Sequence, residues 1–247
     1  MRILICGNGE REKYLAELCP TRGHSTPDHG PWDMAVLPLP KSYLPEETAD
    51  QLPRGQKIVC GLTDAAFDKL AEKRGWRLLR VLQDEAYTQE NAALTAEGAL
   101  FTAMARMNRA LRGSQCLVIG YGRIGKALTG LLRAMGAGVT VAARREESRR
   151  ATGENSVPIP YIPNILPRMD VVFNTVPAPV LGEKELRRVK HDCVLIDLAS
   201  APYGIDQDAA EALGLKAYLE SGLPGRYCPL SAAETLLSFM EREGQYE

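Results

Sequence analysis

A short glycine-rich segment carries the clearest chemical signal in the sequence. It runs Gly120-Tyr121-Gly122-Arg123-Ile124-Gly125 and follows an apolar run at 115–119 that has the composition of a strand. The spacing G-x-G-x-x-G, between a strand and a helix, is typical of a loop that binds the pyrophosphate of a dinucleotide. The first glycine permits a tight turn, the second lets phosphates approach the backbone, and the third lets helix and strand pack closely. A glycine-rich turn without a ligand is the alternative interpretation.

The residues after the next apolar run indicate which dinucleotide would bind. Enzymes that use NAD usually end this strand with a carboxylate, which accepts hydrogen bonds from the ribose hydroxyls. Here Ala143 stands at that position, and Arg144 and Arg145 follow it. Since no carboxylate is there to repel a 2′-phosphate, and two guanidiniums can bind one, the sequence favours NADP over NAD. The alternative is a solvated pair of loop charges.

Further candidates follow three later strand-like runs, at 170–175, 193–198 and 216–219. Ligands of open parallel sheets bind at the carboxyl ends of the strands. We therefore expect a group of residues beside the nicotinamide and its ribose, namely Asn174, Thr175, Val176, Pro177, Asp197 and Ala199. Ser200 and the segment Gly222-Leu223-Pro224 belong to the same rim and are candidates for substrate contact. Taken singly, each segment also fits a plain turn after a strand.

Residues for proton transfer are less evident. His191 precedes the run 193–198, which puts it at the opposite edge of the sheet, and His24 and His29 lie in a proline-rich stretch. The histidines and cysteines have no metal-ligand spacing, and no side chain has the pattern of a nucleophile. We therefore expect no metal and little acid–base catalysis, with Glu97 and Tyr121 as the candidates for it.

The composition narrows the class of protein. The 247 residues are 45% hydrophobic and 25% charged, with a formal net charge of −1, which is typical of a globular protein without a nucleic-acid or membrane partner. No run of 18 apolar residues occurs, and the apolar start is too short for a signal peptide, so a cytoplasmic location is expected. The six cysteines form no C-x-x-C pair and are expected to be reduced.

The first third of the chain has the pattern of a small βα domain. Seven of its prolines fall between residues 20 and 53, which excludes long helices there. Apolar runs at 3–6, 34–37, 57–60 and 77–81 alternate with helical patterns at 11–19 and 64–73. This alternation predicts a parallel sheet.

The remainder predicts a connector helix and a second βα block. Residues 88–111 carry one helical face of Ala93, Ala96, Leu100, Met104, Met107 and Leu111. Strands are expected at 115–119 and 139–143 and at the three runs named above, with a helix at 123–135. Asp206 is expected to cap a short helix that ends at Gly214, and Ser231-Ala232-Ala233-Glu234 predicts the capping box of a last helix.

These elements predict an α/β protein with parallel sheets. A flavodoxin-like, substrate-side domain is expected at 1–90, a connector helix at 91–111 and a Rossmann dinucleotide-binding domain at 112–228. The helix at 229–247 can pack back on the first domain, and the substrate is expected between the two domains.

The chain as a whole resembles the family of dipicolinate synthase A subunits of endospore-forming bacteria. The resemblance rests on Gly7, Arg11 and the segments 33–38, 91–98, 112–125, 143–144, 174–177, 197–200 and 221–225. It is nearly continuous from residue 85 onward and patchy before it, where the chain looks shortened.

The resemblance implies an NADP-linked oxidation of a dihydrodipicolinate-like compound to dipicolinate during sporulation. It also implies a separate, flavoprotein-like B subunit of dipicolinate synthase, with the mother-cell cytoplasm as the location. The substrate would be a small dicarboxylate whose ring becomes aromatic, which requires little acid–base help. Thr95, Glu97 and Pro38 become further candidates for substrate contact.

Two residues depart from the family pattern. After Ser200 the family has an arginine where this chain has Ala201, and Tyr203 replaces a glycine. We hypothesise that Arg226 takes over a carboxylate contact. Two alternative functions stay open, an oxidoreductase for another small carboxylate and a non-catalytic nucleotide-binding subunit, and the chain can also form a homo-oligomer.

Overall fold

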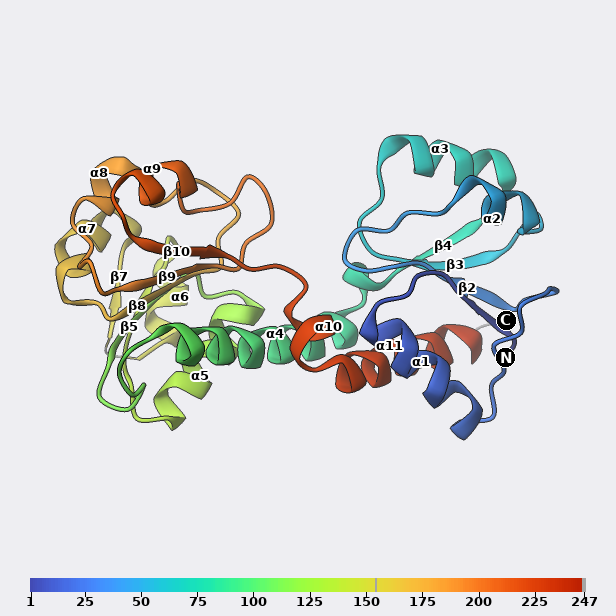
Figure 1. Ribbon diagram of the computed structural model, residues 1–247, viewed down its shortest axis with the longest axis horizontal. Helices are drawn as coiled ribbons and strands as arrows, with labels where there is room; N and C mark the ends of the chain where they lie inside the picture. Colours follow the sequence, from blue (N-terminus) through green and yellow to red (C-terminus); the bar gives the residue numbers. More distant parts are fainter. Residues whose placement is uncertain (154, 246–247) are drawn as a thin grey trace. The chain divides into compact units, whose positions relative to one another are not determined.

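The computed structural model describes residues 1–153 and 155–245 of the chain. The chain divides into two compact units, one formed by Met1–Leu94 with Pro224–Glu247 and the other by Thr95–Leu223. Each unit has one parallel sheet with helices around it, which confirms the predicted α/β class (Figure 1). Among the described helices, none combines the length and the apolar composition that a membrane span requires.

The first unit holds a four-stranded sheet in the order β1-β2-β3-β4. Its strands are β1 (Ile3–Ile5), β2 (Met34–Val36), β3 (Lys57–Cys60) and β4 (Arg77–Arg80). Ser25 adds a parallel bridge to Arg2, and its carbonyl accepts a 2.8 Å hydrogen bond from the Ile3 N–H. If this bridge is counted as a reduced second strand, the order becomes 2-1-3-4-5, as in flavodoxin-like sheets.

Helices from both ends of the chain complete this unit. They are α1 (Glu10–Thr21), α2 (Glu46–Gln51), α3 (Ala65–Arg74), the 3₁₀ turn η1 (Val81–Gln83), the first part of α4 (Glu85–Arg106), α10 (Leu223–Tyr227) and α11 (Pro229–Gln245). α11 packs on α1. It contributes Leu236, Leu237 and Phe239 to a core that also contains Ile3 and Leu15.

The last helix begins earlier than its capping-box pattern predicts. α11 starts at Pro229, and the Ala232 N–H already donates a 2.9 Å hydrogen bond to the Cys228 carbonyl. Proline suits the first position of a helix because the missing N–H has no partner there. Ser231 therefore lies inside the first turn, where its carbonyl accepts from the Thr235 hydroxyl, and the predicted capping box is wrong.

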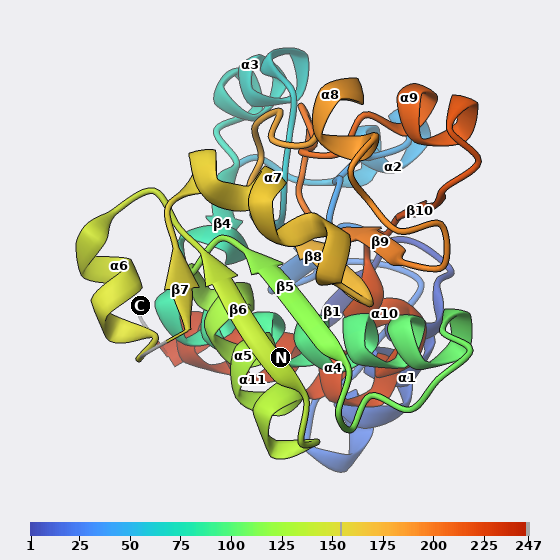
Figure 2. The same ribbon diagram turned by 90° about the vertical axis from the view of Figure 1, so that its left-hand side faces the viewer.

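The second unit holds a six-stranded parallel sheet in the order β10-β9-β8-β5-β6-β7, as Figure 2 shows. Its strands are β5 (Gln115–Ile119), β6 (Gly138–Ala142), β7 (Ser156–Val157), β8 (Val171–Asn174), β9 (Val194–Asp197) and β10 (Lys216–Leu219). This is the 3-2-1-4-5-6 order of a Rossmann sheet, whose direction of winding reverses between β5 and β8. The sequence did not predict β7, which has two residues.

The helices of the second unit are mostly short. They are α5 (Arg123–Ala134), α6 (Glu146–Ala151), α7 (Ile162–Ile165), α8 (Glu183–Leu186) and α9 (Gln207–Ala212), with the 3₁₀ turns η2 (Ile159–Tyr161) and η3 (Leu166–Arg168). The Asp206 carboxylate caps α9 by accepting a 3.0 Å hydrogen bond from the Ala209 N–H, as predicted. Gly214, with φ of +65°, lies two residues beyond the end of that helix.

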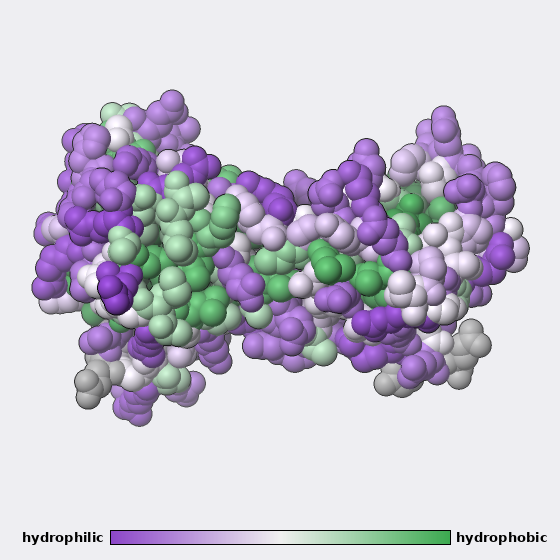
Figure 3. All heavy atoms as spheres, turned by 60° about the horizontal axis from the view of Figure 1, so that its bottom comes forward, coloured by the Kyte–Doolittle hydropathy of each residue, from purple (hydrophilic) through white to green (hydrophobic). Residues whose placement is uncertain are grey.

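The helix α4 corrects two predictions. It ends at Arg106, so Met107 and Leu111 lie outside it. Its buried residues from 92 onward are small and include Ala92, Ala96, Ala99 and Ala103 with Thr95 and Thr102, whereas Met104 of the predicted face is 54% exposed. Small side chains let a helix approach its neighbours closely, so the face with small residues is the one that is buried, and the larger residues lie outside. Apolar side chains gather on the face of the second unit that carries α4 and α5 (Figure 3).

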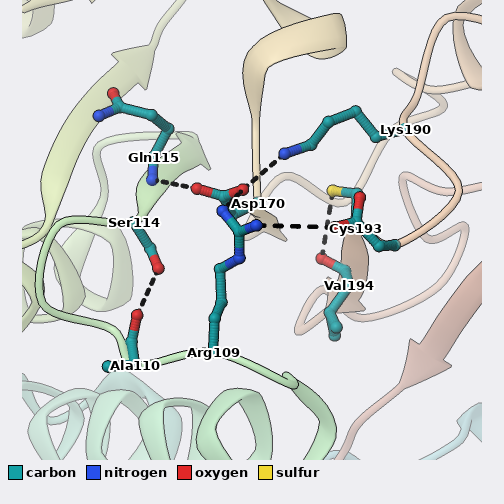
Figure 4. A network of polar contacts seen from close by, with 9 residues as sticks. Arg109, Ala110, Ser114, Gln115, Asp170, Lys190, Cys193 and Val194 are labelled. Carbon is teal, nitrogen blue, oxygen red and sulfur yellow. Dashed lines mark hydrogen bonds and ion pairs between the residues drawn. The ribbon is translucent and has the colours of Figure 1, made fainter.

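A buried carboxylate joins three segments at the amino edge of the six-stranded sheet (Figure 4). Asp170 is 6% exposed and accepts hydrogen bonds from Arg109 (2.8 Å), from Lys190 (2.5 Å) and from the Gln115 N–H (2.7 Å). Burial alone would raise its pKa. The hydrogen bonds from Lys190 and Gln115 and the charges of both cations outweigh burial and hold the pKa below its ordinary value.

Candidate functional site

The phosphate loop has the backbone that its glycines require. Gly120 has φ of +98°, and a Cβ there would collide with the Thr175 hydroxyl oxygen. A Cβ on Gly125 would collide with the carbonyl oxygen of Gly120, which shows how closely α5 approaches the end of β5. Gly122 differs, because no atom lies within 4 Å of the place its Cβ would take. Two glycines therefore serve the fold, and the middle one leaves open space.

That space lies at the amino end of α5. Gly122 is the N-cap residue, and as a glycine it has no side chain to accept a hydrogen bond from the first turn of this 12-residue helix. Helix N-termini carry N–H donors and a partial positive charge, which stabilise an anion. Arg123 adds an exposed cation in the first turn. These residues fit the pyrophosphate of a dinucleotide.

The segment after β6 supplies the two predicted cations. Ala143 is buried and still belongs to the sheet edge, because its N–H donates a 3.1 Å hydrogen bond to the Val157 carbonyl. Arg144 and Arg145 are exposed, and among the described residues neither has an ion-pair partner. Two exposed guanidiniums at this edge suit a 2′-phosphate.

The sequence did not single out Arg149, which organises this segment. Its Nη1 donates hydrogen bonds to the carbonyl oxygens of Ala143 (2.9 Å) and Arg144 (2.8 Å). No sequence pattern marks this role, because any residue can supply a carbonyl as the partner.

At the carboxyl ends of β8 and β9, two predicted cofactor residues face inward. Asn174 and Asp197 have no exposed surface. The Asp197 carboxylate accepts hydrogen bonds from the Asn174 Nδ2 (2.7 Å) and from the backbone N–H groups of Ala199 (3.1 Å), Gly204 (2.7 Å) and Ile205 (2.8 Å). Its oxygens thus hold the loop 198–205 rather than project from the sheet edge. Thr175, Val176 and Pro177 retain exposed surface, as does Ser200.

The two acid–base candidates belong to different elements, Tyr121 to the glycine-rich loop and Glu97 to α4. The Tyr121 hydroxyl donates a 3.3 Å hydrogen bond to the Ala151 carbonyl, which directs it toward α6 on the β6 side of the sheet. The residues expected beside the nicotinamide follow β8, on the other side of β5. The Tyr121 hydroxyl is thus directed to the opposite side of β5 from those residues. Glu97 is exposed on α4, close to the buried Thr95.

The first unit brings other predicted residues together at the carboxyl edge of its own sheet. Arg11 is 7% exposed, and its Nη2 donates a 2.7 Å hydrogen bond to the Leu39 carbonyl. The guanidinium carbon lies 3.9 Å from the position of a Cβ on Gly225, so α10 packs beside it. A Cβ on Gly7 would lie 3.0 Å from Pro38. Pro38 and the segment 224–226 therefore belong to this unit.

Arg226 lies on the surface of α10. Its guanidinium carbon is 5.1 Å from the centre of the Tyr227 ring, and its Nη2 is 3.3 Å from the Tyr227 hydroxyl. Gly222, with φ of +63°, and the buried Leu223 close the second unit just before it.

The histidines and cysteines are distributed over both units. His24 lies 3.1 Å from Glu241 in the first unit, and His191 precedes β9 at the amino edge of the second sheet. All six cysteines are free, and burial raises the pKa of Cys116 and of Cys193 to about 12. Within the part of the chain that the structure describes, no three such side chains are grouped as metal ligands.

Comparisons with known proteins agree with this geometry. The family described as "D-isomer specific 2-hydroxyacid dehydrogenase, NAD binding domain" matches residues 80–218. The A subunit of dipicolinate synthase from Bacillus subtilis (strain 168) is 29% identical over 203 residues, which are 81% of this chain and 68% of that protein. The predicted resemblance is thereby confirmed.

Solved structures show the same fold. The dipicolinate synthase A subunit from Bacillus halodurans superimposes with a TM-score of 0.88 at 24% identity, covering 100% of this chain and 98% of that chain. A transhydrogenase from Sinorhizobium meliloti reaches a TM-score of 0.74 at 16% identity, covering 91% of this chain and 79% of that chain.

Proposed function

Because the chain belongs to the family of D-isomer specific 2-hydroxyacid dehydrogenase NAD-binding domains, we propose that it is an NADP-dependent oxidoreductase that converts a dihydrodipicolinate-like dicarboxylate to dipicolinate. The family match indicates that the cofactor is a nicotinamide dinucleotide. The observation that carries the substrate is the similarity to the A subunit of dipicolinate synthase over 81% of this chain.

Each part of the cofactor has candidate residues in the second unit. The backbone of 120–125 and the amino end of α5 would hold the pyrophosphate, since Gly122 leaves room for it. Arg144 and Arg145 would hold the 2′-phosphate of NADP. Thr175, Val176 and Pro177 would lie beside the nicotinamide, at the point where the sheet reverses its winding.

A bound NADP would supply the acceptor for a hydride from a C–H bond of the substrate, and the proton that must also leave when the ring becomes aromatic would pass to solvent. The product ring is aromatic, so the substrate itself provides the driving force, and the protein's task is to orient that C–H bond. This division of labour agrees with the placement of the described histidines, none of which follows a strand of the second unit. Ser200, Thr95, Glu97, Pro38 and Arg226 remain proposed contacts of the dicarboxylate.

The relative is named as one of the subunits of a synthase, which supports a second component. We propose the B subunit of dipicolinate synthase as the partner, with the cytoplasm of a sporulating mother cell as the location. A dehydrogenase of another small carboxylate is the second candidate, which the family match favours.

The test mixes the protein, NADP and freshly formed dihydrodipicolinate precursor, with and without the proposed partner. We expect the absorbance of dipicolinate and of NADPH to rise together. Turnover of 2-hydroxy acids alone would favour the second candidate. Binding of NADPH without any turnover in the complete mixture would identify a non-catalytic nucleotide-binding protein, and product formation with NAD but not NADP would overturn the cofactor choice.

The hypothesis for Arg226 has its own test. If Arg226 holds a substrate carboxylate, Arg226→Ala raises the KM for the dicarboxylate about tenfold while the KM for NADP stays unchanged. An unchanged KM for the dicarboxylate would reject it.

A further inference from the structure

The short helix α6 is held in place by one of its own side chains. The Arg149 guanidinium reaches back over the first turn of α6 to the chain between β6 and α6, where Nη1 donates to the carbonyls of Ala143 and Arg144. These are the carbonyls of consecutive residues, at the point where the chain leaves the sheet edge. Arg149 is half-buried, whereas Arg144, Arg145 and Arg150 are exposed.

The main chain of Arg149 anchors the other end of α6. Its carbonyl accepts hydrogen bonds from the Thr152 hydroxyl (2.8 Å) and from the Ser156 hydroxyl (3.1 Å) at the start of β7. One residue thus ties α6 to β6 through its side chain and to β7 through its backbone. A helix of six residues is not stable alone, so these ties determine where it lies.

Two further contacts fix α6 to the phosphate loop and to α5. The Tyr121 hydroxyl donates to the Ala151 carbonyl (3.3 Å), and the Arg133 Nη2 donates to the Thr152 carbonyl (2.7 Å). Tyr121 is the second residue of the G-x-G-x-x-G segment. The segment that carries Arg144 and Arg145 is therefore connected to the loop that would hold the pyrophosphate.

We propose that Arg149 is a positioning residue for NADP: it fixes the backbone from which Arg144 and Arg145 project, so that both guanidiniums meet the 2′-phosphate without further ordering. Holding two flexible cations ready for an anion lowers the entropy lost on binding. This inference rests on the proposed choice of NADP. It predicts that Arg149 affects the discrimination between NADPH and NADH, and not merely the binding of dinucleotides.

The experiment titrates the full-length protein with NADPH and NADH and compares wild type, Arg149→Met, Arg149→Lys and Arg150→Met. Arg150→Met is the matched control, because it removes the same charge from the same helix, and among the described residues the ion-pair partner of Arg150 is Glu146. We expect Arg149→Met to weaken NADPH binding about tenfold and NADH binding less than about twofold. Arg149→Lys should restore part of the preference, because an ammonium can still donate to one carbonyl.

Each outcome decides a different question. A wild-type protein that binds NADH as tightly as NADPH overturns the proposed cofactor and this inference with it. If wild type prefers NADPH and Arg149→Met keeps that preference, only the role of Arg149 is overturned. If Arg149→Met weakens the binding of NADPH and NADH equally, Arg149 has only a general structural role and the proposal is wrong. If Arg149→Met and Arg150→Met weaken NADPH binding equally, the loss of one positive charge explains the effect, and the proposal is also wrong.

Discussion

The Asn174 Nδ2 donates a 2.7 Å hydrogen bond to the Asp197 Oδ1, and neither side chain has exposed surface. The two residues end the neighbouring strands β8 and β9. Because Asp197 also accepts three backbone N–H groups of the loop 198–205, this pair determines the shape of the sheet edge where a nicotinamide would lie.

Replacing Asp197 with Asn should release that loop. A carboxylate accepts all four hydrogen bonds, whereas an amide presents its own NH₂ group to at least one donor, which then loses its partner. We expect Asp197→Asn to lower the free energy of unfolding by about 2–3 kcal/mol. Urea titration measures it, with the exposed Asp208→Asn as the control. A loss below about 0.5 kcal/mol, the usual range for surface changes, would show that the loop does not depend on this carboxylate.

The Asp170 carboxylate should make stability depend on acid pH. Its pKa in the folded protein lies below the value of about 3.9 for an unfolded chain. The stability it contributes is therefore fully present above pH about 4 and is lost as the pH falls through the folded pKa. Asp170→Asn should cost about 2–4 kcal/mol at pH 7, and the difference from wild type should shrink in strong acid.

A neighbouring aspartate provides the control for that experiment. Asp192 lies 3.9 Å from Arg109, and its side chain is 45% exposed. Solvent screens such a pair, so Asp192→Asn should cost less than about 0.5 kcal/mol at any pH. Equal losses for the two variants would contradict a special role of the buried carboxylate.

The backbone conformation at Tyr203 should make the protein less stable than it would be with glycine at this position. It is the described non-glycine residue with positive φ, at +60°, where a Cβ costs about 1 kcal/mol. Tyr203→Gly should therefore raise the free energy of unfolding by about 1 kcal/mol relative to Tyr203→Ala, which removes the same ring but keeps the Cβ. Thermal unfolding of the two variants measures the difference, and equal melting temperatures would contradict the prediction.

Gly122→Ala should weaken the binding of NADPH without destabilising the fold. The Cβ meets no atom of the protein, but it occupies the space that the pyrophosphate needs. We expect NADPH affinity to fall about tenfold or more while stability changes by less than about 1 kcal/mol. Gly130→Ala is the control on the same helix, because its Cβ is also free of contacts but lies away from the phosphate loop. It should stabilise the protein by up to about 1 kcal/mol and leave affinity intact.

Much of the fold is predictable because buried parallel strands are continuous apolar runs. β5 and β10 have the predicted ends, and β8 and β9 differ by one residue at each end. The prediction fails where periodicity is uninformative. In α4 alanines occur on several faces, so spacing alone could not show that Ala92 and Ala99 are buried and Met104 is exposed.

The site is predictable to the level of the backbone. The glycine spacing is visible in the sequence because a larger residue does not fit at Gly120 or Gly125, and because Gly122 leaves space for a ligand. The direction of a side chain is not visible in the same way. Asp197 ends a strand, as a ligand contact would, but the N–H groups of the loop that follows occupy its oxygens.

The first unit is formed by two separate stretches of the chain, and this affects the order in which the two units can fold during protein synthesis. Its core needs Leu236, Leu237 and Met240 of α11, which are translated after every strand of both units. The second unit is one continuous stretch, Thr95–Leu223, and has all its strands before α11 is made. Strands β1 to β4 are translated before the second unit but should therefore reach their native packing after it, and until α11 is made their apolar faces stay open to association with other chains.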